Sequence, residues 1–330
     1  MKILFHILTV TVLLVLVPQY SPALALEITA VGDIYLSQRI IDQHANDLLN
    51  IKLSGDIVFA NFEGVLSATH TRNDILMLRL TMPMDAVDVL RKIGVNTLSL
   101  ANNDSLDLGL KHYENTFLKL KQSGFNIAGL DDDGKAIDID HMKIRFIAFS
   151  FSGVNNVNDL ERASKLIRSF KEEIIIISAH MGGESMKGYH IPSEMEFFGD
   201  EKRGDVREFA HTCIDAGADL ILGHGPHILR GIELYRNKLI VYSLGNFIFD
   251  YPGVEKHGST PAYSVSISMN RNGNFQMAKI TNYTLQHGIP VLDKANRAFR
   301  HIKHLSLTGL KNDNLVFKGG GTIYPKGGNL

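Results

Sequence analysis

The chain has almost no cysteine and almost no net charge. Cys213 is its only cysteine, so an internal disulfide bond is excluded. Lysine and arginine together number 34, aspartate and glutamate together number 35, and the formal net charge is −1. A chain so close to neutrality has no overall electrostatic attraction for nucleic acid. The sequence therefore predicts no nucleic-acid partner.

The chain also lacks internal repeats, low-complexity linkers and abrupt changes of composition. Hydrophobic residues make up 45% and charged residues 21%, which is a normal balance for a globular protein. A chain of 330 residues is long enough to bury a sizeable core. We predict one domain over residues 26–310. A loose, glycine-rich tail is predicted over residues 311–330, which include the stretch "KGGGTIYPKGGNL".

The first 25 residues have the pattern of a secretory signal peptide. Lys2 precedes the apolar run "ILFHILTVTVLLVLV", and Ala23-Leu24-Ala25 fits the small-residue rule for a cleavage site. The apolar run is short for a membrane span. We predict a mature chain that begins near Leu26 and is exported to a periplasmic, secreted or cell-envelope location. An uncleaved N-terminal anchor is the alternative, and it also predicts export of the domain.

Short apolar segments alternate with amphipathic ones along most of the chain. Strands are predicted at 27–33, 56–64, 95–103, 125–130, 143–150, 173–180, 219–224 and 238–247. Helices are predicted at 38–49, 85–94, 113–124 and 159–171, and Cys213 lies on the apolar face of another. This alternation favours an α/β fold with largely parallel sheets. Residues 262–285 resemble a hairpin that turns at Asn272-Gly273, and a last helix is predicted within 292–305.

The stretch "LILGHGPHILRGIELY", residues 220–235, presents two histidines directly after an apolar strand. Gly225 and Pro226 separate His224 from His227. Glycine lets the backbone approach a neighbour closely, and proline restricts the turn. Two imidazoles held on a stiff turn at a strand end suggest a metal ion or an anion between them.

Other polar side chains share this position at the end of a predicted strand. They are Asp33, Glu63, Asn102, Asn103, Asp104 and His180. The carboxyl ends of strands in an open α/β sheet line one crevice where ligands bind. Taken singly, each residue fits a helix cap, an Asx-turn or a core histidine. Their common placement favours a metal site, and ligands without a thiol favour Zn²⁺, Mn²⁺ or Fe, with two bridged ions as one option.

A short segment after the strand at 238–242 carries two further candidates, Ser243 and Asn246. Gly245 between them lets the chain turn. The pair either orients a ligand histidine or binds substrate. The alternative is a tight turn that covers a packed Phe247.

Several motifs resemble the CapA family of capsule-synthesis proteins, which is linked to poly-γ-glutamate capsules. They are "AVGDIYL", "FANFEG", "LSLANNDSLDLG", "SAHMGGE" and the long run "GADLILGHGPHILRGIELYRNKLIVYSLGNFIFD", in this order from Asp33 to Asp250. The family resembles calcineurin-like metallophosphoesterases, and this resemblance implies a four-layer α/β/β/α sandwich with metals at the strand ends. It implies as metal ligands Asp33, Glu63, Asn103, His180, His224 and His227. We further predict Asp104 and His227 as catalytic residues, and as substrate contacts Asn102, Glu184, Ser243 and Asn246.

Two departures from the phosphoesterase pattern bear on the chemistry. Asp33-Ile34-Tyr35 stands where phosphoesterases usually have Asp-x-His, a loss that CapA-like proteins commonly share. Asp104 stands where the family pattern Asn-Asn-His has histidine, which in phosphoesterases contacts the phosphate or protonates the leaving group. An aspartate with a pKa near ~3.9 is a poor proton donor at neutral pH and repels phosphate. Asp104 is then either an additional metal ligand or a carboxyl whose pKa burial raises.

The resemblance leaves more than one function open. The first is an exported metal-dependent hydrolase or transferase that acts on an anionic polymer or its lipid-linked precursor. The second is a non-catalytic, metal-containing subunit that binds the polymer within a membrane-bound capsule synthesis complex. A nucleotidase would rest on fold analogy alone. The long loop over 185–204 either borders the cleft, with Lys187, Tyr189 and His190 as contacts, or is a structural excursion packed by Phe197 and Phe198.

Overall fold

The computed structural model describes residues 25–68, 79–131, 133–170, 174–184, 189–250 and 260–327. All but the last residue of the predicted signal peptide lies outside these ranges, and so does Lys187. None of the helices within these ranges is long and apolar enough to span a membrane.

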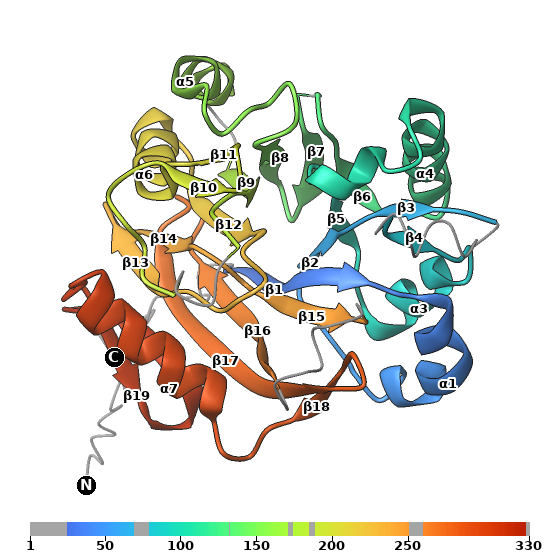
Figure 1. Ribbon diagram of the computed structural model, residues 1–330. Coiled ribbons are helices and arrows are strands. Elements are labelled where there is room, and N and C mark those ends of the chain that lie inside the picture. Colours follow the sequence, from blue (N-terminus) through green and yellow to red (C-terminus); the bar gives the residue numbers. More distant parts are fainter. Residues whose placement is uncertain are drawn as a thin grey trace, which may run out of the picture.

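The larger sheet has ten strands within the described residues, in the path β19-β20-β17-β16-β1-β2-β5-β6 (Figure 1). Its parallel part is β1 (Leu26–Tyr35), β2 (Ile57–Phe62), β5 (Thr97–Ser99) and β6 (Asn126–Ala128). Its antiparallel part is β16 (Thr260–Met269), β17 (Phe275–Gln286), β20 (Thr322–Pro325) and β19 (Leu315–Lys318). β15 (Asn246–Phe249) pairs with the end of β1, and β18 (Ile289–Leu292) pairs with β17.

The second sheet has six strands within the same residues, in the order β13-β14-β12-β9-β8-β7. The strands are β13 (Ile232–Tyr235), β14 (Lys238–Val241), β12 (Leu220–His224), β9 (Ile174–His180), β8 (Met142–Ser150) and β7 (Lys135–Ile139). The four central strands, β14, β12, β9 and β8, are mutually parallel. The predicted parallel character of these apolar segments is confirmed.

Alternate side chains of the six-stranded sheet enter two different cores. Phe146 of β8 faces the larger sheet and contacts Phe59 of β2, with 5.4 Å between the ring centroids. Phe149, three residues further along β8, packs edge-on against Phe209 on the other face of the sheet. The helices α5 (Leu160–Arg168) and α6 (Val206–Ala216) lie on that face. Cys213 of α6 is fully buried there, as predicted for a core residue.

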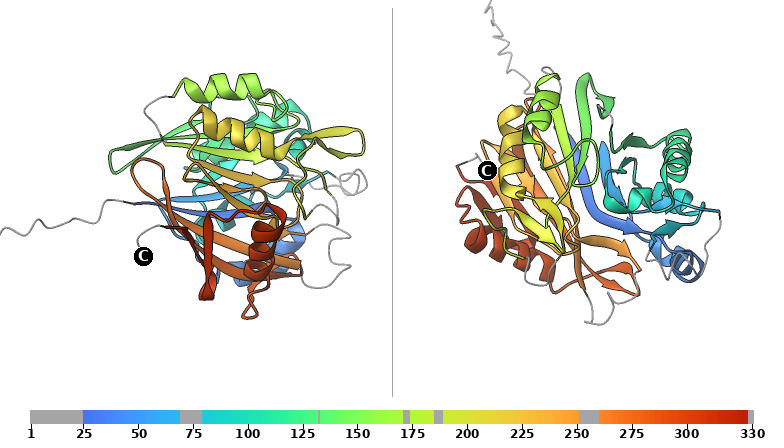
Figure 2. Two further views of the ribbon diagram at one scale, coloured as in Figure 1. Left: turned by 90° about the vertical axis from the view of Figure 1, so that its left-hand side faces the viewer. Right: turned by 45° about the horizontal axis from the view of Figure 1, so that its top comes forward.

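Three helices cover the opposite side of the larger sheet (Figure 2). They are α1 (Gln38–Leu48), α3 (Ala86–Ile93) and α4 (Leu110–Gln122), and they bury Ile40, Leu90 and Leu120 in the core of that sheet. The order of layers is therefore helix, sheet, sheet, helix. The predicted four-layer α/β/β/α sandwich is confirmed. The helix α7 (Arg297–His304) packs on β16 and β17.

The remaining short elements connect these layers. They are β3 (Val65–Leu66), β4 (Thr81–Met82), β10 (Glu196–Phe198), β11 (Glu201–Gly204), the 3₁₀ turns η1 (Asn103–Leu106) and η4 (Gly319–Gly321), and the π-helical turn η3 (Leu305–Gly309).

The predicted looseness of the C-terminal tail is wrong. β19 and β20 form a hairpin, and Ala278 of β17 pairs with Ile323 of β20. Leu315 and Ile323 are buried, because alternate residues of these short strands face the core of the larger sheet.

Two smaller expectations are also corrected. Phe197 and Phe198 do not pack the 185–204 loop inward, because they lie on the β10–β11 hairpin with 53% and 44% of their surface exposed. The β16–β17 turn is wider than the Asn272-Gly273 pair. The Asn270 side chain accepts hydrogen bonds from the backbone N–H groups of Asn272 and Asn274, so the turn includes five residues, 270–274.

Candidate metal centre

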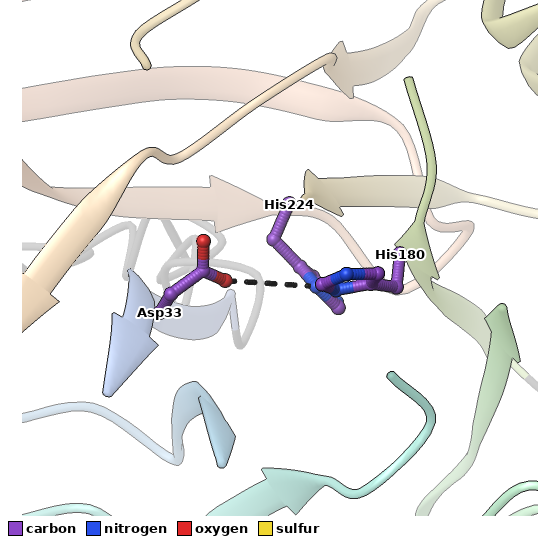
Figure 3. A group of neighbouring side chains, drawn as sticks. All are labelled: Asp33, His180 and His224. Carbon is purple, nitrogen blue, oxygen red and sulfur yellow. Dashed lines mark hydrogen bonds and ion pairs between the residues drawn. The ribbon is translucent and has the colours of Figure 1, made fainter. Parts of the chain in front are cut away.

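The carboxyl ends of strands from both sheets meet at one place. Asp33 lies on β1 and Glu63 directly follows β2, whereas His180 and His224 end two adjacent strands of the other sheet in the same register. Figure 3 shows Asp33 facing the two histidines across the junction of the sheets. Asp33, Glu63, His180 and His224 are all fully buried. The predicted convergence of these side chains is therefore present in the fold.

The first group of side chains at this junction is Asp33, His180 and His224. The two Nδ1 atoms of His180 and His224 lie 2.9 Å apart, and Asp33 Oδ1 lies 3.7 Å from His224 Nδ1. One potential ligand atom from each of the three residues lies within 4.8 Å of the others. This spacing suits three ligands around one ion, since metal–ligand bonds are about 2.0–2.2 Å.

The second group consists of Asp33, Glu63 and His227. Asp33 Oδ2 lies 3.2 Å from His227 Nδ1, and Glu63 Oε1 lies 3.6 Å from His227 Nε2. Glu63 Oε1 also lies 3.9 Å from His180 Nε2, so the two groups adjoin. Asp33 directs one oxygen toward each group. This arrangement fits a carboxylate that bridges two ions.

Several buried polar atoms at this junction have no hydrogen-bond partner among the described residues. They are Asp33 Oδ2, both carboxylate oxygens of Glu63, Asn103 Oδ1 and His180 Nε2. A buried polar group without a partner costs free energy, so most such groups are satisfied. All five are oxygen or nitrogen atoms of the type that coordinates divalent cations. The residues present therefore fit a metal centre.

Burial and mutual charge shift the ionisation of these groups. Burial, with the charge of Asp33, raises the pKa of Glu63 well above its usual value. Burial lowers the pKa of His180 and lowers that of His224 to about 4. For His227, burial is outweighed by Glu63 and Asp33, so its pKa is raised. His180 and His224 are thus neutral imidazoles at neutral pH, the form that ligates metals.

Asn61 and Ser178 form hydrogen bonds with two of the candidate ligands, and the sequence analysis did not identify them. The side-chain amide of Asn61 donates to Asp33 Oδ1 at 2.9 Å, and Ser178 Oγ lies 2.7 Å from His224 Nε2. Each lies two residues before a predicted ligand, Asn61 before Glu63 and Ser178 before His180. Polar residues at this spacing in apolar strands point to the same face as the ligand, which is the signal that would have found them.

Asn102 supports Asp33 indirectly rather than lining an open cleft. Its amide donates to Asn61 Oδ1 at 3.0 Å and to the carbonyl of Phe62, and its own oxygen accepts from Ser105 Oγ at 2.8 Å. With 1% of its surface exposed, Asn102 has no free face for substrate. The structure thus places it as a positioning residue beneath the carboxylates.

The turn that carries His227 is fixed by the segment 243–246. His227 has a left-handed backbone with φ of 57°, and its Nδ1 lies 2.9 Å from Asn246 Oδ1. Ser243 Oγ donates to the carbonyl of Ile228 at 2.7 Å, so this buried hydroxyl ties the two segments together. Asn246 orients the imidazole of His227, a candidate ligand, and Ser243 holds the turn.

Close backbone approach makes this arrangement possible at Gly32. The backbone N–H of Asp33 donates to the carbonyl of Gly245 at 2.8 Å. A Cβ atom at Gly32 would lie 1.7 Å from that carbonyl oxygen, which no side chain allows. The lack of a side chain at Gly32 therefore lets the 243–246 segment pack directly against β1, beside Asp33.

Asp104 and Glu184 lie beside the centre. Asn103 donates to Asp104 Oδ2 at 2.9 Å, and burial, with the charge of Asp107, raises the pKa of Asp104 to about 7. The sequence left Asp104 either as a metal ligand or as a carboxyl with a raised pKa, and this shift supports the second interpretation. Glu184 is partly exposed and forms an ion pair with Arg203 at 3.1 Å, and its charge contributes to the raised pKa values of Glu63, Asp104 and His227.

The fold and the centre together define an α/β sandwich with a buried histidine–carboxylate centre at the junction of its two sheets. The chain belongs to the family described as bacterial capsule synthesis protein PGA_cap, whose family model matches residues 27–251. The matched segment contains Asp33, Glu63, Asn103, His180, His224 and His227. The predicted membership of the CapA family is confirmed, and with it involvement in capsule or poly-γ-glutamate synthesis.

Two relatives carry names that agree with this family. The chain is 28% identical over 271 residues to the "PGA biosynthesis protein CapA" of Bacillus subtilis (strain 168), covering 76% of this chain and 70% of the relative. It is 25% identical over 337 residues to the "capsule biosynthesis protein CapA" of Bacillus anthracis, covering 89% and 77%. Among solved structures, a phosphatase from Mycoplasma pneumoniae is 14% identical with a TM-score of 0.48, covering 85% of this chain and 97% of that one. This likeness is too low to support a statement about activity.

Proposed function

We propose that the chain is an exported, metal-dependent hydrolase or transferase of capsule synthesis that acts on an anionic polymer or its precursor. The observation that carries the proposal is the shared carboxylate of Asp33, which faces two groups of potential ligands. Buried ligand atoms without hydrogen-bond partners support the binding of one or two divalent ions, of Zn, Mn or Fe type.

Each residue of the centre has a role in this proposal. Asp33, Glu63, His180, His224 and His227 hold the metal, with Asn103 as a further oxygen ligand. A divalent ion in such a centre lowers the pKa of a bound water and polarises an ester or amide. Asn61 and Ser178 fix the orientation of Asp33 and His224 through their hydrogen bonds.

Proton transfer to a leaving group falls to Asp104. Its pKa of about 7 gives it both protonation states near neutral pH, which suits a general acid. His227 has 24% of its side chain exposed, whereas Asp33, Glu63, His180 and His224 are fully buried, so His227 would also contact substrate. Glu184, partly exposed and paired with Arg203, would orient a substrate group beside the centre.

Metal content is the first test of the proposal. Protein purified without a chelator should contain at least one divalent ion per chain by elemental analysis, and Asp33→Asn should reduce this content strongly. Asp138→Asn, on the exposed part of β7, is the matched control and should leave it unchanged. Equal metal content in unmodified protein and Asp33→Asn would contradict the assignment of the centre.

Turnover is the second test. Metal-loaded protein should hydrolyse activated phosphodiesters or γ-glutamyl peptides, and Asp33→Asn should not. Full metal occupancy with no turnover on either substrate class would favour the second candidate, a non-catalytic polymer-binding subunit of a membrane-bound capsule synthesis complex. The observation that favours this second candidate is Asp104 in place of the histidine of the family pattern.

Export is the third part of the proposal. The signal-peptide pattern at the N-terminus supports it. Mass spectrometry of the chain recovered from the cell envelope or medium should find a mature N-terminus near Leu26. A soluble cytosolic protein that retains Met1 would contradict export.

A further inference from the structure

Arg230 is fully buried, and an arginine is almost never fully buried unless it is paired. Its guanidinium forms a bidentate ion pair with Glu196 of β10, at 2.8 Å from Nη1 to Oε1 and 2.6 Å from Nη2 to Oε2. Glu196 Oε2 also accepts from the backbone N–H of Gly183 at 3.0 Å, and Arg230 Nη2 donates to the carbonyl of Gly183 at 3.4 Å. The ion pair therefore binds both polar groups of the Gly183 backbone.

This ion pair lies between the segments that follow two of the candidate ligands. Gly183 follows His180 by three residues, and Arg230 follows His227 by three residues. Gly182 lets the two segments come together, because a Cβ atom there would lie 2.8 Å from Arg230 Nη1. The ion pair thus connects the segment after His180 to the turn that carries His227.

Net stability does not account for the ion pair. Two buried charges lose their hydration, and apolar side chains of similar volume often replace such a pair without loss of stability. Arg230 Nε also has no hydrogen-bond partner among the described residues, which adds to the cost of burial. The best-attested use of buried ionic groups is to select one arrangement of the chain among several. The arrangement in question here is that of the two ligand-bearing segments.

The two groups of potential ligands differ in how firmly the chain holds them. In the first group, His180 and His224 end adjacent parallel strands in the same register, so the sheet fixes both. In the second group, which contains Asp33, Glu63 and His227, the histidine lies in a turn with a left-handed φ of 57°. This backbone conformation is costly for a residue with a side chain and persists only where the surrounding structure holds it. The second group therefore depends on contacts outside the strands.

We propose that Arg230 and Glu196 are positioning residues for a metal ion in the second group of ligands. The inference rests on the proposed function, because it concerns the second of the two ions that the centre would hold. The ion pair fixes the turn that carries His227 against the segment after His180, and so sets the distance between the two groups. An ion in the first group does not depend on the pair, because the strands hold both of its histidines.

Calorimetric titration of chelator-treated protein with Mn²⁺ or Zn²⁺ tests the inference. Unmodified protein should bind two ions per chain. Arg230→Lys keeps the charge but lacks the planar fork that bonds both oxygens of Glu196, so one ion should bind about 10–100-fold more weakly. The other ion should keep its affinity. His227→Ala should abolish the binding step that Arg230→Lys weakens, whereas His180→Ala should abolish the other step.

A double variant separates positioning from stability. Arg230→Met/Glu196→Met replaces the ion pair with apolar side chains and should weaken the same binding step as Arg230→Lys does. Lys238→Met/Asp219→Leu is the matched control, because Asp219 Oδ1 lies 2.6 Å from Lys238 Nζ and Asp219 Oδ2 accepts from the backbone N–H of Ile175 at 2.8 Å. This control pair lies at the ends of β9, β12 and β14 that are opposite to the centre, so both ions should keep their affinity.

Several outcomes would overturn the inference. They are unchanged affinity for both ions in Arg230→Lys, equal weakening of both ions, or weakening of the same step by the control variant. Thermal unfolding of each variant shows whether the fold is retained, and Arg230→Lys decides the outcome alone if the Arg230→Met/Glu196→Met variant does not fold.

The titration also separates this inference from the proposed function. A single ion in unmodified protein would overturn the inference and leave the proposed function intact, because that function requires only one ion. No ion in unmodified protein would contradict both. Two ions that respond to Arg230→Lys as expected, but support no turnover, would support the positioning role and contradict only the catalytic part of the proposed function.

Discussion

At the scale of single residues, Asp104 distinguishes the proposed hydrolase or transferase from a non-catalytic polymer-binding subunit. The sequence left this aspartate either as a ligand or as a protonated carboxyl, and burial beside Asp107 favours the protonated form. A buried carboxyl with a pKa of about 7 can donate a proton, whereas an exposed one cannot at neutral pH. The identity of the residue was visible in the sequence, but its environment was not.

Replacing this residue with the histidine of the family pattern gives a direct prediction. Asp104→His keeps a group that exchanges a proton near neutral pH, so hydrolysis of an activated phosphodiester should stay within about tenfold of the unmodified protein. Asp104→Asn has no such group and should lose about 10²–10⁴-fold, which is the usual worth of general acid catalysis. Initial rates with metal-loaded protein measure both.

Asp104→Asn is the control for charge alone, because its amide cannot act as the acid. A loss of metal from Asp104→His would identify Asp104 as a ligand instead. Full metal content with no hydrolysis of phosphodiesters or γ-glutamyl substrates would end the hydrolase interpretation.

The candidate metal ligands were easier to predict than the residues that orient them through hydrogen bonds. Asp33, Glu63, His180 and His224 follow apolar strands, and parallel strands bring such ends together. Asn61, Ser178 and the supporting role of Asn102 depend on which strand neighbours which, and on register. A single sequence does not show that pairing, because the hydrogen-bonded residues lie far apart in the chain. Ser178 and His224, for example, are 46 positions apart.

At the scale of elements, two segments that contain glycine had opposite outcomes. Gly245 was expected to let the chain turn, and its φ of 64° between β14 and β15 agrees, because glycine adopts this conformation without a partner. The "KGGGTIYPK" segment was predicted to be loose for its glycine content, yet Thr322–Pro325 forms a strand. Its partner, β17, lies more than 40 residues earlier at Lys279, so tertiary pairing overrides the local preference.

Gly32 gives a prediction about the packing of β1 against the 243–246 segment. Gly32→Ala places a Cβ atom 1.7 Å from the carbonyl oxygen of Gly245, so the segment has to move. We expect a loss of about 3 kcal/mol or more in the free energy of unfolding, measured by urea denaturation. Gly319→Ala, where an added Cβ meets nothing within 4 Å, is the control and should stay within about 0.5 kcal/mol. Equal stability of the two variants would contradict the close approach.

Glu233 on the edge strand β13 gives a prediction about pH. Burial alone would raise its pKa, but hydrogen bonds from His211, Tyr242 and Arg207 outweigh burial and lower it. A lowered folded-state pKa contributes stability above the unfolded value, and this contribution is lost as pH falls through the folded value. Glu233→Gln should therefore cost about 1 kcal/mol at pH 7.

Thermal unfolding between pH 3 and pH 7 measures this effect. The difference in stability between unmodified protein and Glu233→Gln should shrink below a pH of about 4, where the carboxylate becomes protonated. Glu161→Gln on the exposed start of α5 should show no such dependence. A difference that stays constant with pH would exclude the charged form as its cause.

At the scale of the whole molecule, the C-terminal hairpin belongs to the larger sheet. Deletion of residues 315–330 removes the buried side chains of Leu315 and Ile323 and uncovers the backbone of β17. Burial of each such side chain contributes about 1.5–3 kcal/mol, so the truncated chain should lose at least about 3 kcal/mol. Chemical denaturation of the two proteins provides the comparison.

The matched control is a shorter deletion that begins at Gly327, an exposed residue with open space around it. It should leave the denaturation midpoint unchanged. Equal midpoints for the long deletion and the unmodified chain would show that β19 and β20 contribute nothing to the sheet.

The position of β1 has a consequence for the order in which the molecule is completed. β1 is the first strand of the described residues, but its neighbours β15 and β16 begin at Asn246 and Thr260. On the proposed export route the chain emerges from its N-terminus, so β1 arrives outside the cytoplasm long before two of its partners. His224, His227 and Asn246 arrive late as well, and the centre is incomplete until they do. Metal loading would then follow translocation, and the ion would be selected by what the outer compartment supplies rather than by the cytoplasmic pool.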